Sequence, residues 1–300
     1  MNYEDLQAHM VDFKANWAQF GVTIMCDSWT GPTMMCIINF MVFCNGQMFF
    51  HKSVNATGHA QNAEFIYDCI KKVIVEEIRE QFVVHLVTDN GSNYKKACQQ
   101  LTNEFSHITW QPCAAHTINL MLKDIRHFDE VAEVVDSAKR EYAACYDERK
   151  DRWRAYSSFW DKQDKFQAWM ISSEWKNSDW ENDNEHLFAT DCLMNRIWWD
   201  KMELLLKSVT PIYSVLRFAD QQKNGTISRF LPRMIHAKEE IYGKLKHDDR
   251  ATLSLLGRFM EVISRRTKYL LNDTLMLAAA TLDPEALYKS KLAQHHSCVL

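Results

Sequence analysis

Between residues 21 and 125, hydrophobic positions alternate between short continuous runs and sets with helical spacing. Two continuous runs, 21–26 (GVTIMC) and 34–43 (MMCIINFMVF), predict strands, and we expect the second to be buried on both faces. The dipeptide Asn45-Gly46 follows the second run and predicts a tight hairpin into a third strand over 48–54. Three consecutive antiparallel strands are therefore predicted.

A helix over 65–78 is predicted next, because its apolar residues recur on one face at a period of 3.6. Strands are then predicted over 82–88 and 107–110, with a helix over 93–101 between them. Pro112 ends the last strand, and a helix carrying Cys113 and His116 follows. The resulting order, β-β-β-α-β-α-β-α, is the order of a ribonuclease H-like core.

Strand patterns stop near residue 128, and the rest of the chain is helical in period. Helices are predicted over 131–146, 196–219, 227–245, 250–270 and 274–280, with a polar loop over 177–185. We expect the long helix to bend or break before Pro211. The predicted domains are a ribonuclease H-like core over 1–127 and an all-α, insertion-type domain over 128–300 that ends in a short unstructured tail.

Composition narrows the class of protein. The chain is 47% hydrophobic and 25% charged, which is ordinary for a globular protein, and its net charge of −4 excludes a strongly basic nucleic-acid coat. We find no apolar run of the ~18 residues that a membrane helix needs, so no membrane partner is expected. Nine cysteines, an odd number scattered along the chain, favour reduced thiols in a nuclear or cytoplasmic protein.

Two aspartates are the first candidates for chemistry. Asp27 and Asp89 each follow an apolar run that predicts a strand, and we expect both to stand at the carboxyl ends of adjacent strands. A single aspartate there is usually a turn residue. Two aspartates at the ends of adjacent strands can together hold a hard divalent cation such as Mg²⁺, because this ion prefers oxygen ligands. Two such ions would activate a nucleophile and stabilise the leaving oxygen of a phosphodiester.

Three motifs carry a resemblance to a known family. They are 27–30 (DSWT), 87–94 (VTDNGSNY) and 110–120 (WQPCAAHTINL), in this order and spacing. They resemble the hAT superfamily of transposases, and most closely its plant branch of transposase-like proteins that is catalogued as a domain of unknown function. Looser similarity continues through Pro211 and the 282–284 (LDP) segment to Tyr288.

The resemblance implies roles for particular residues. Asp27 and Asp89 match two of three metal-binding carboxylates, and Cys113 with His116 match a pair beside the active site. In the family, an aromatic residue near the start of the helical insertion helps to hold a flipped base. Arg152-Trp153 is the candidate for that position, and a core role for the tryptophan is the alternative.

The chain also departs from the family pattern. The third carboxylate of the family is a glutamate on a helix after the closing motif, whereas residues 290–300 here contain no Asp or Glu. About 26 residues precede Asp27, fewer than the zinc finger and linker of complete members would occupy. We therefore expect an internal fragment that lacks the finger and the dimerisation region and is catalytically defective.

Two further features have structural alternatives. Cys113-x-x-His116 supplies half of a zinc site at most, so we expect no structural zinc and assign the pair to bracing the active site. Lys95 and Lys96 are candidates for contacts with nucleic-acid phosphates, with a solvated helix face as the alternative.

Three functions remain open from the sequence. The first is a transposase-derived, defective protein with weak or vestigial Mg²⁺ binding and weak, non-specific DNA binding. The second is an active Mg²⁺-dependent transposase or nuclease in which Asp283 or Glu285 replaces the third carboxylate. The third is a protein-interaction module that binds itself or related transposase-like proteins through its aromatic-rich helical domain. The sequence thus does not decide whether the chain is an enzyme, and it favours a protein without catalytic activity.

Overall fold

The computed structural model describes residues 10–32, 34–143, 152–178, 183–221, 226–246, 250–271 and 273–289. The chain divides into two compact units, Met1–Thr117 and Ile118–Leu300. The division falls within helix α5 (Ala114–Ile125), so the first unit ends before the residue 127 expected from the loss of strand patterns. The expected unstructured tail lies outside the described residues.

The first unit contains a five-stranded mixed sheet, as the sequence predicts. Its order is β3-β2-β1-β4-β5. Strands β1, β2 and β3 form an antiparallel meander, whereas β4 and β5 run parallel to β1. The strand bounds are β1 Val22–Thr30, β2 Cys36–Cys44, β3 Gln47–Asn55, β4 Val83–Thr88 and β5 Thr109–Pro112.

The predicted hairpin between β2 and β3 is confirmed. Asn45 and Gly46 both have positive φ, 47° and 75°, as a tight two-residue turn requires. The expectation that β2 is buried on both faces is wrong. Ile38, Phe40 and Val42 are buried, but the residues between them are half-buried and Phe43 is 40% exposed. The continuous apolar run therefore reflects one covered face and one partly covered face.

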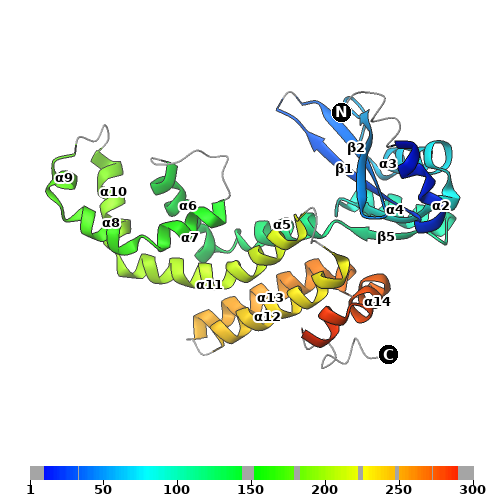
Figure 1. Cartoon of the computed structure of the whole chain (residues 1–300). Helices are drawn as coiled ribbons and strands as arrows, with labels where there is room; N and C mark the ends of the chain where they lie inside the picture. Colours follow the sequence, from blue (N-terminus) through cyan, green and yellow to red (C-terminus); the bar gives the residue numbers. More distant parts are fainter. Residues whose placement is uncertain are drawn as a thin grey trace. The chain divides into compact units, whose positions relative to one another are not determined.

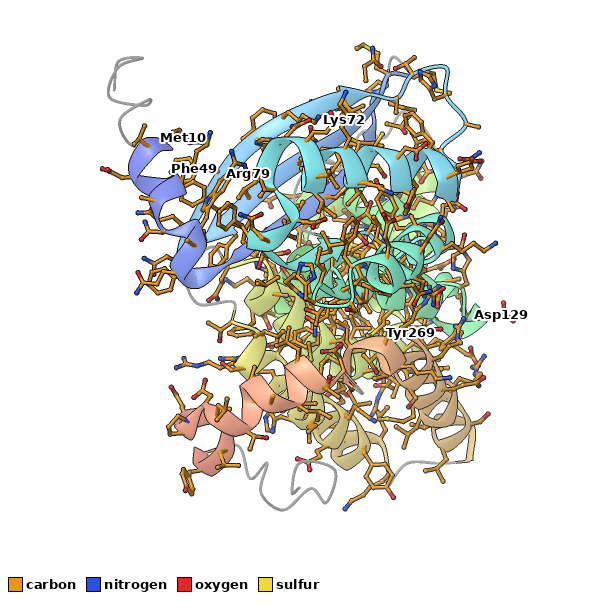
Figure 2. All side chains as sticks on the ribbon, turned by 90° about the vertical axis from the view of Figure 1, so that its right-hand side faces the viewer. Met10, Phe49, Lys72, Arg79, Asp129 and Tyr269 are labelled. Carbon is orange, nitrogen blue, oxygen red and sulfur yellow. The ribbon has the colours of Figure 1, made fainter. Side chains whose placement is uncertain are left out.

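Helices complete the core of this unit on the buried face of the sheet (Figure 1). The predicted helix over 65–78 is α3 (Ala63–Lys72) followed by a π-helical turn, η1 (Val73–Ile78). A short 3₁₀ turn, η2 (Glu80–Phe82), leads into β4, and α4 (Ser92–Glu104) follows it. At the N-terminal end, α2 (Trp17–Phe20) joins the same core, against which Met10 and Phe49 also pack (Figure 2).

All the secondary-structure elements described in the second unit are helices. Its helices are α6 Asp129–Ala143, α7 Arg152–Trp160, α8 Gln163–Met170, α9 Ser173–Lys176, α10 Asp183–Met194, α11 Arg196–Ala219, α12 Ile227–Leu245, α13 Arg250–Leu271 and α14 Thr274–Leu282, followed by η3 Glu285–Lys289.

Two predictions for this unit need correction. The loop expected over 177–185 ends earlier, because α10 begins at Asp183. The first turn of α10 is polar, so the spacing of hydrophobic residues does not predict it. Helix α11 continues through Pro211, so the alternative of a break before it is wrong, whereas a bend there stays a prediction. Pro211 is buried with Val209 and Ile212, and this burial holds the helix together despite the hydrogen bond that proline removes.

The seven cysteines within the described residues are all free thiols. This agrees with the reduced state predicted from their number and spacing; Cys145 and Cys298 lie outside the described residues. Among the helices that the structure describes, none is long and apolar enough to cross a membrane.

Candidate metal site

Asp27 and Asp89 stand at equivalent positions on neighbouring strands. Parallel pairing of β1 with β4 runs as far as Cys26 opposite Thr88, and the next residue on each strand is an aspartate. The predicted placement of this pair on adjacent strands is confirmed. Asp27 does not end β1, however: the strand continues to Thr30 along β2, with Asp27 opposite Asn39. Only its pairing with β4 ends there.

Asp89 is held from two sides. His116 Nδ1 lies 3.1 Å from Asp89 Oδ1, and the backbone N–H and hydroxyl of Ser28 each lie 3.4 Å from Oδ2. The Asp89 side chain is only 13% exposed, so these contacts compensate for the water that it loses. Ser28 was not predicted as a site residue, although its position next to Asp27 in the DSWT motif was a usable signal.

The two carboxyl groups contact each other, and their pKa values move in opposite directions. Partial burial, the negative charge of Asp89 and the hydrogen bond between the two carboxyls raise the pKa of Asp27. Burial also opposes ionisation of Asp89, but the hydrogen bond and charge of His116 outweigh it and lower the pKa of Asp89. The two carboxyls therefore differ in their tendency to ionise, and Asp89 is the stronger acid.

Backbone and side-chain hydrogen bonds fix the segments that carry these groups. The Cys113 N–H donates to the Thr88 carbonyl at 2.7 Å, which joins the start of α5 to the end of β4. Trp110 Nε1 donates to the Thr88 hydroxyl at 3.0 Å, and Asn90 Nδ2 donates to Thr117 Oγ1 at 3.0 Å. The strand end, the following turn and the first turn of α5 are thus tied together.

Cys113 precedes α5 instead of lying on it, which corrects the predicted helix. Its sulfur accepts hydrogen bonds from the backbone N–H groups of Ala115 and His116, so Cys113 caps the helix that carries His116. Burial nevertheless raises the pKa of the Cys113 thiol, which is therefore neutral near pH 7. This placement agrees with the predicted position of both residues beside the aspartates.

The donor set fits a small, hard divalent cation. Two carboxyl groups that contact each other offer oxygen ligands at one position, where a cation would offset their like charges. Within the described part of the chain, no group of three or more His, Cys, Asp or Glu side chains converges on one metal position. Asp27 and Asp89 are the two side chains that could hold such a cation, and His116 contacts Asp89.

A hollow of about 240 Å³ adjoins Asp89. Its lining residues come from β1, the loop before α3, α3, the turn between β4 and α4, α4 and α5. They are Ser28, Gln61, Ile66, Asp89, Gly91, Ser92, Asn93, Tyr94 and His116. Neither Lys95 nor Lys96 lines it: Lys95 is half-buried on α4 and Lys96 is exposed. The predicted phosphate contacts of these two lysines therefore stay predictions.

The remaining predicted site residues, Arg152 and Trp153, begin α7. Their side chains lie outside the described part of the structure, so their proposed contact with a flipped base stays a prediction.

Residues 1–140 match the model of a family described as "Domain of unknown function (DUF659)". The match covers the whole sheet and the Asp27, Asp89, Cys113 and His116 positions. No curated protein and no solved structure matches the chain. The coarse part of the resemblance, to a family catalogued as a domain of unknown function, is therefore confirmed over this region.

Proposed function

We propose that this chain is a transposase-derived protein of the hAT type, built on a ribonuclease H-like core, that holds one divalent cation against nucleic acid. The observation that carries the proposal is the contact between the Asp27 and Asp89 carboxyls on adjacent parallel strands. The strand order β3-β2-β1-β4-β5 supports the ribonuclease H-like assignment, because in that core the first and fourth strands are neighbours.

The chain's own groups supply positioning and charge. Ser28 and His116 orient Asp89, while Asp27 is oriented by its place in β1. When bound, a cation there would neutralise a phosphodiester oxygen and activate a nucleophilic water or hydroxyl. Two-ion chemistry needs a further carboxylate. We therefore expect the pair by itself to cleave or join strands about 10²-fold to 10⁴-fold more slowly than a site with all its carboxylates.

The alternative of an active nuclease requires Asp283 or Glu285 as the third carboxylate. Both groups already have partners within the second unit. Asp283 accepts a hydrogen bond from Ser228 at 2.7 Å and from the Glu285 backbone N–H at 2.9 Å. Glu285 pairs with Arg229 at 2.6 Å. These contacts favour a structural role for both acids, at the turn into η3.

The third alternative, a protein-interaction module, depends on aromatic residues at the surface of the helical unit. Trp175, Trp198 and Trp199 are buried, with exposed fractions of 7% or less. Phe159 stacks on Trp199 with ring centroids 5.7 Å apart. These three tryptophans belong to the core of the second unit, whereas Trp169 and Tyr288 are 43% and 78% exposed, so an interaction role would depend on the exposed aromatics and not on the tryptophan core.

Calorimetric titration with Mg²⁺ and Mn²⁺ tests the proposal. We expect one weak site that Asp27→Asn and Asp89→Asn each abolish. The control is Asp68→Asn, which removes an exposed aspartate of α3 and should leave the titration unchanged. Binding that survives both site substitutions would refute the assignment.

A labelled duplex incubated with Mg²⁺ or Mn²⁺ tests the expected lack of efficient cleavage. We expect binding that is weak, independent of sequence and strongly reduced by salt, because phosphate contacts release counterions. Cleavage that Asp89→Ala abolishes would establish the active-nuclease alternative. Cleavage that survives this substitution would come from a contaminant.

A further inference from the structure

A hollow of about 550 Å³ lies within the second unit, between α11, α12 and η3. Helices α11 and α12 pack side by side, and η3 packs against α12 (Figure 1). The volume of the hollow falls within the roughly 300–1,000 Å³ of pockets that hold small molecules. All its lining residues belong to these three elements, so the hollow is separate from the candidate metal site.

Part of the lining is apolar and rigid. Pro211 and Pro232 stand inside α11 and α12, and both line the hollow. Both prolines are buried, as are the neighbouring lining residues Val215, Ala237 and Ala286. Proline rings and short or branched side chains have few rotamers to lose, so this apolar wall can be covered by a ligand at little cost in side-chain entropy.

Helix α12 also brings nitrogen-bearing side chains to the hollow. Arg229, Arg233 and His236 line it, and their spacing of four and three residues places them on one face of the helix. The charge of Arg229 is already balanced, because its guanidinium pairs with Asp283 across 3.5 Å and with Glu285 across 2.6 Å. Arg229 therefore joins α12 to η3 at this end of the hollow.

Arg233 differs from Arg229 in its partners. Its guanidinium lies over the ring of Phe218, 4.2 Å from the centroid, and forms no ion pair with the residues that the structure describes. The aromatic ring holds the cation in place but leaves its charge uncompensated by a carboxylate. A planar guanidinium held in this way can donate two parallel hydrogen bonds to a carboxylate.

Acidic side chains limit the charge that a ligand can carry. Glu239 and Glu240 also line the hollow, further along α12, and Glu240 pairs with Lys244 at 2.5 Å. A second negative charge on a ligand would meet these carboxylates and be repelled. The lining therefore accepts one carboxylate beside Arg233 and disfavours polyanions such as a nucleic-acid backbone.

We infer that this hollow binds a small organic monocarboxylate. Its carboxylate pairs with Arg233, and its apolar body covers the wall formed by Pro211, Pro232 and Val215. The guanidinium supplies orientation and the apolar wall supplies burial, which is the usual division of roles in a small-molecule pocket. This site is independent of the proposed metal site.

Fluorine NMR of the full chain with para-fluorophenylpropionate tests the inference. We expect the ligand resonance to shift and broaden with a dissociation constant of about 1 mM, as a ligand with so few atoms allows. The neutral para-fluorophenylpropanamide should bind about 10-fold more weakly, because it cannot form the charge-assisted pair. The dianion para-fluorobenzylmalonate should also bind more weakly than the monocarboxylate.

Two variants at Arg233 test the role of its guanidinium. Arg233→Gln should weaken binding of the monocarboxylate by about 10-fold, and Arg233→Lys should retain part of the affinity because it keeps the charge. The matched control is Arg258→Gln. Arg258 also lies over an aromatic ring, 4.7 Å from the centroid of Phe128, but it does not line the hollow. This control should bind the probe like the wild type.

Ser214→Phe tests the hollow separately from the charge. Ser214 is an exposed lining residue, so a phenyl group there should obstruct the hollow without overpacking the core, and the probe should no longer bind. Thermal unfolding shows whether each variant is folded. If Arg233→Gln does not fold, the comparison of the acid with the amide in the wild type decides the question.

Three results would overturn the inference. The first is a ligand resonance that the wild type leaves unchanged at several millimolar probe. The second is equal wild-type affinity for the acid and the amide. The third is undiminished affinity in folded Arg233→Gln or Ser214→Phe, which would place the probe elsewhere on the chain.

Discussion

At the scale of single residues, Asp27 and Asp89 are unequal members of one pair. Asp89 has His116 and Ser28 as partners, whereas Asp27 faces mainly the negative charge of Asp89. A site that gathers like charges for a ligand reduces stability when the ligand is absent. The loss of folding free energy should therefore come mainly from Asp27.

Substitution of each aspartate by asparagine should separate the two roles. The pKa of Asp27 is raised in the folded state, so its stabilising contribution is present at low pH and is lost as pH rises through that pKa. Asp27→Asn should therefore raise the melting temperature near pH 7 by about 3 °C, with little effect near pH 3.

Asp89→Asn should do the opposite. The pKa of Asp89 is lowered, so its contribution is present above the unfolded value and is lost as pH falls. This variant should melt a few degrees lower near pH 7. Scanning calorimetry at both pH values in EDTA measures the two effects, with Asp68→Asn as the exposed control. Equal shifts in the same direction for both site variants would contradict the asymmetry.

At the scale of elements, the junction between α2 and β1 depends on one glycine. Gly21 has a φ of 69°, and a Cβ there would lie 2.6 Å from Val84 Cγ1 of β4. Gly257, on the exposed face of α13, has no atom within 4 Å of an added Cβ. The same substitution should therefore have opposite effects at these two positions.

Gly21→Ala should lower the free energy of unfolding by about 2 kcal/mol or more, from backbone strain and overpacking. Gly257→Ala should raise it by about 0.5–1 kcal/mol, because alanine restricts the unfolded chain and favours helix. Urea denaturation followed by circular dichroism compares the two variants with the wild type. Destabilisation by Gly257→Ala would show that this face of α13 is covered.

The elements themselves follow closely from local sequence signals. Asn45-Gly46 sets the β2–β3 hairpin through positive φ angles, and the period of 3.6 in α3 and α12 matches their buried faces. What local patterns miss depends on tertiary contacts. The extension of β1 past Asp27 depends on β2, and the continuity of α11 through Pro211 depends on its burial.

The candidate site was predictable to a similar extent. Asp27 and Asp89 could be paired because strand order follows from the sequence of elements. The contacts of Ser28 with Asp89 could not be predicted, because they join residues 61 positions apart through the exact register of β1 and β4. The spacing predicts a helical position for Cys113, because spacing alone cannot distinguish a capping residue from the first turn of a helix.

At the scale of the whole molecule, the end of the described helical unit exposes large apolar side chains. Leu282 is 81% exposed and Tyr288 is 78% exposed, and Tyr269 and Leu275 nearby are 47% and 38% exposed. Such exposure favours association between copies of the chain.

Light scattering at increasing protein concentration should therefore show an average mass that rises above 35.3 kDa. Leu282→Ser should weaken the association, and Ile197→Ser should not, although Ile197 is 66% exposed at the start of α11. A single monomeric species at high concentration in the wild type would contradict the prediction.

The position of β1 between β2 and β4 also sets an order of events during folding. The β1-β2-β3 meander closes through short connections, whereas β4 reaches β1 only across a much longer loop, so β4 should dock late. Asp89 then joins Asp27 after the main barrier, and a cation can recognise only the finished sheet. If Mg²⁺ binds this pair as proposed, it should slow unfolding and leave the refolding rate unchanged, because its site forms only after the main folding barrier.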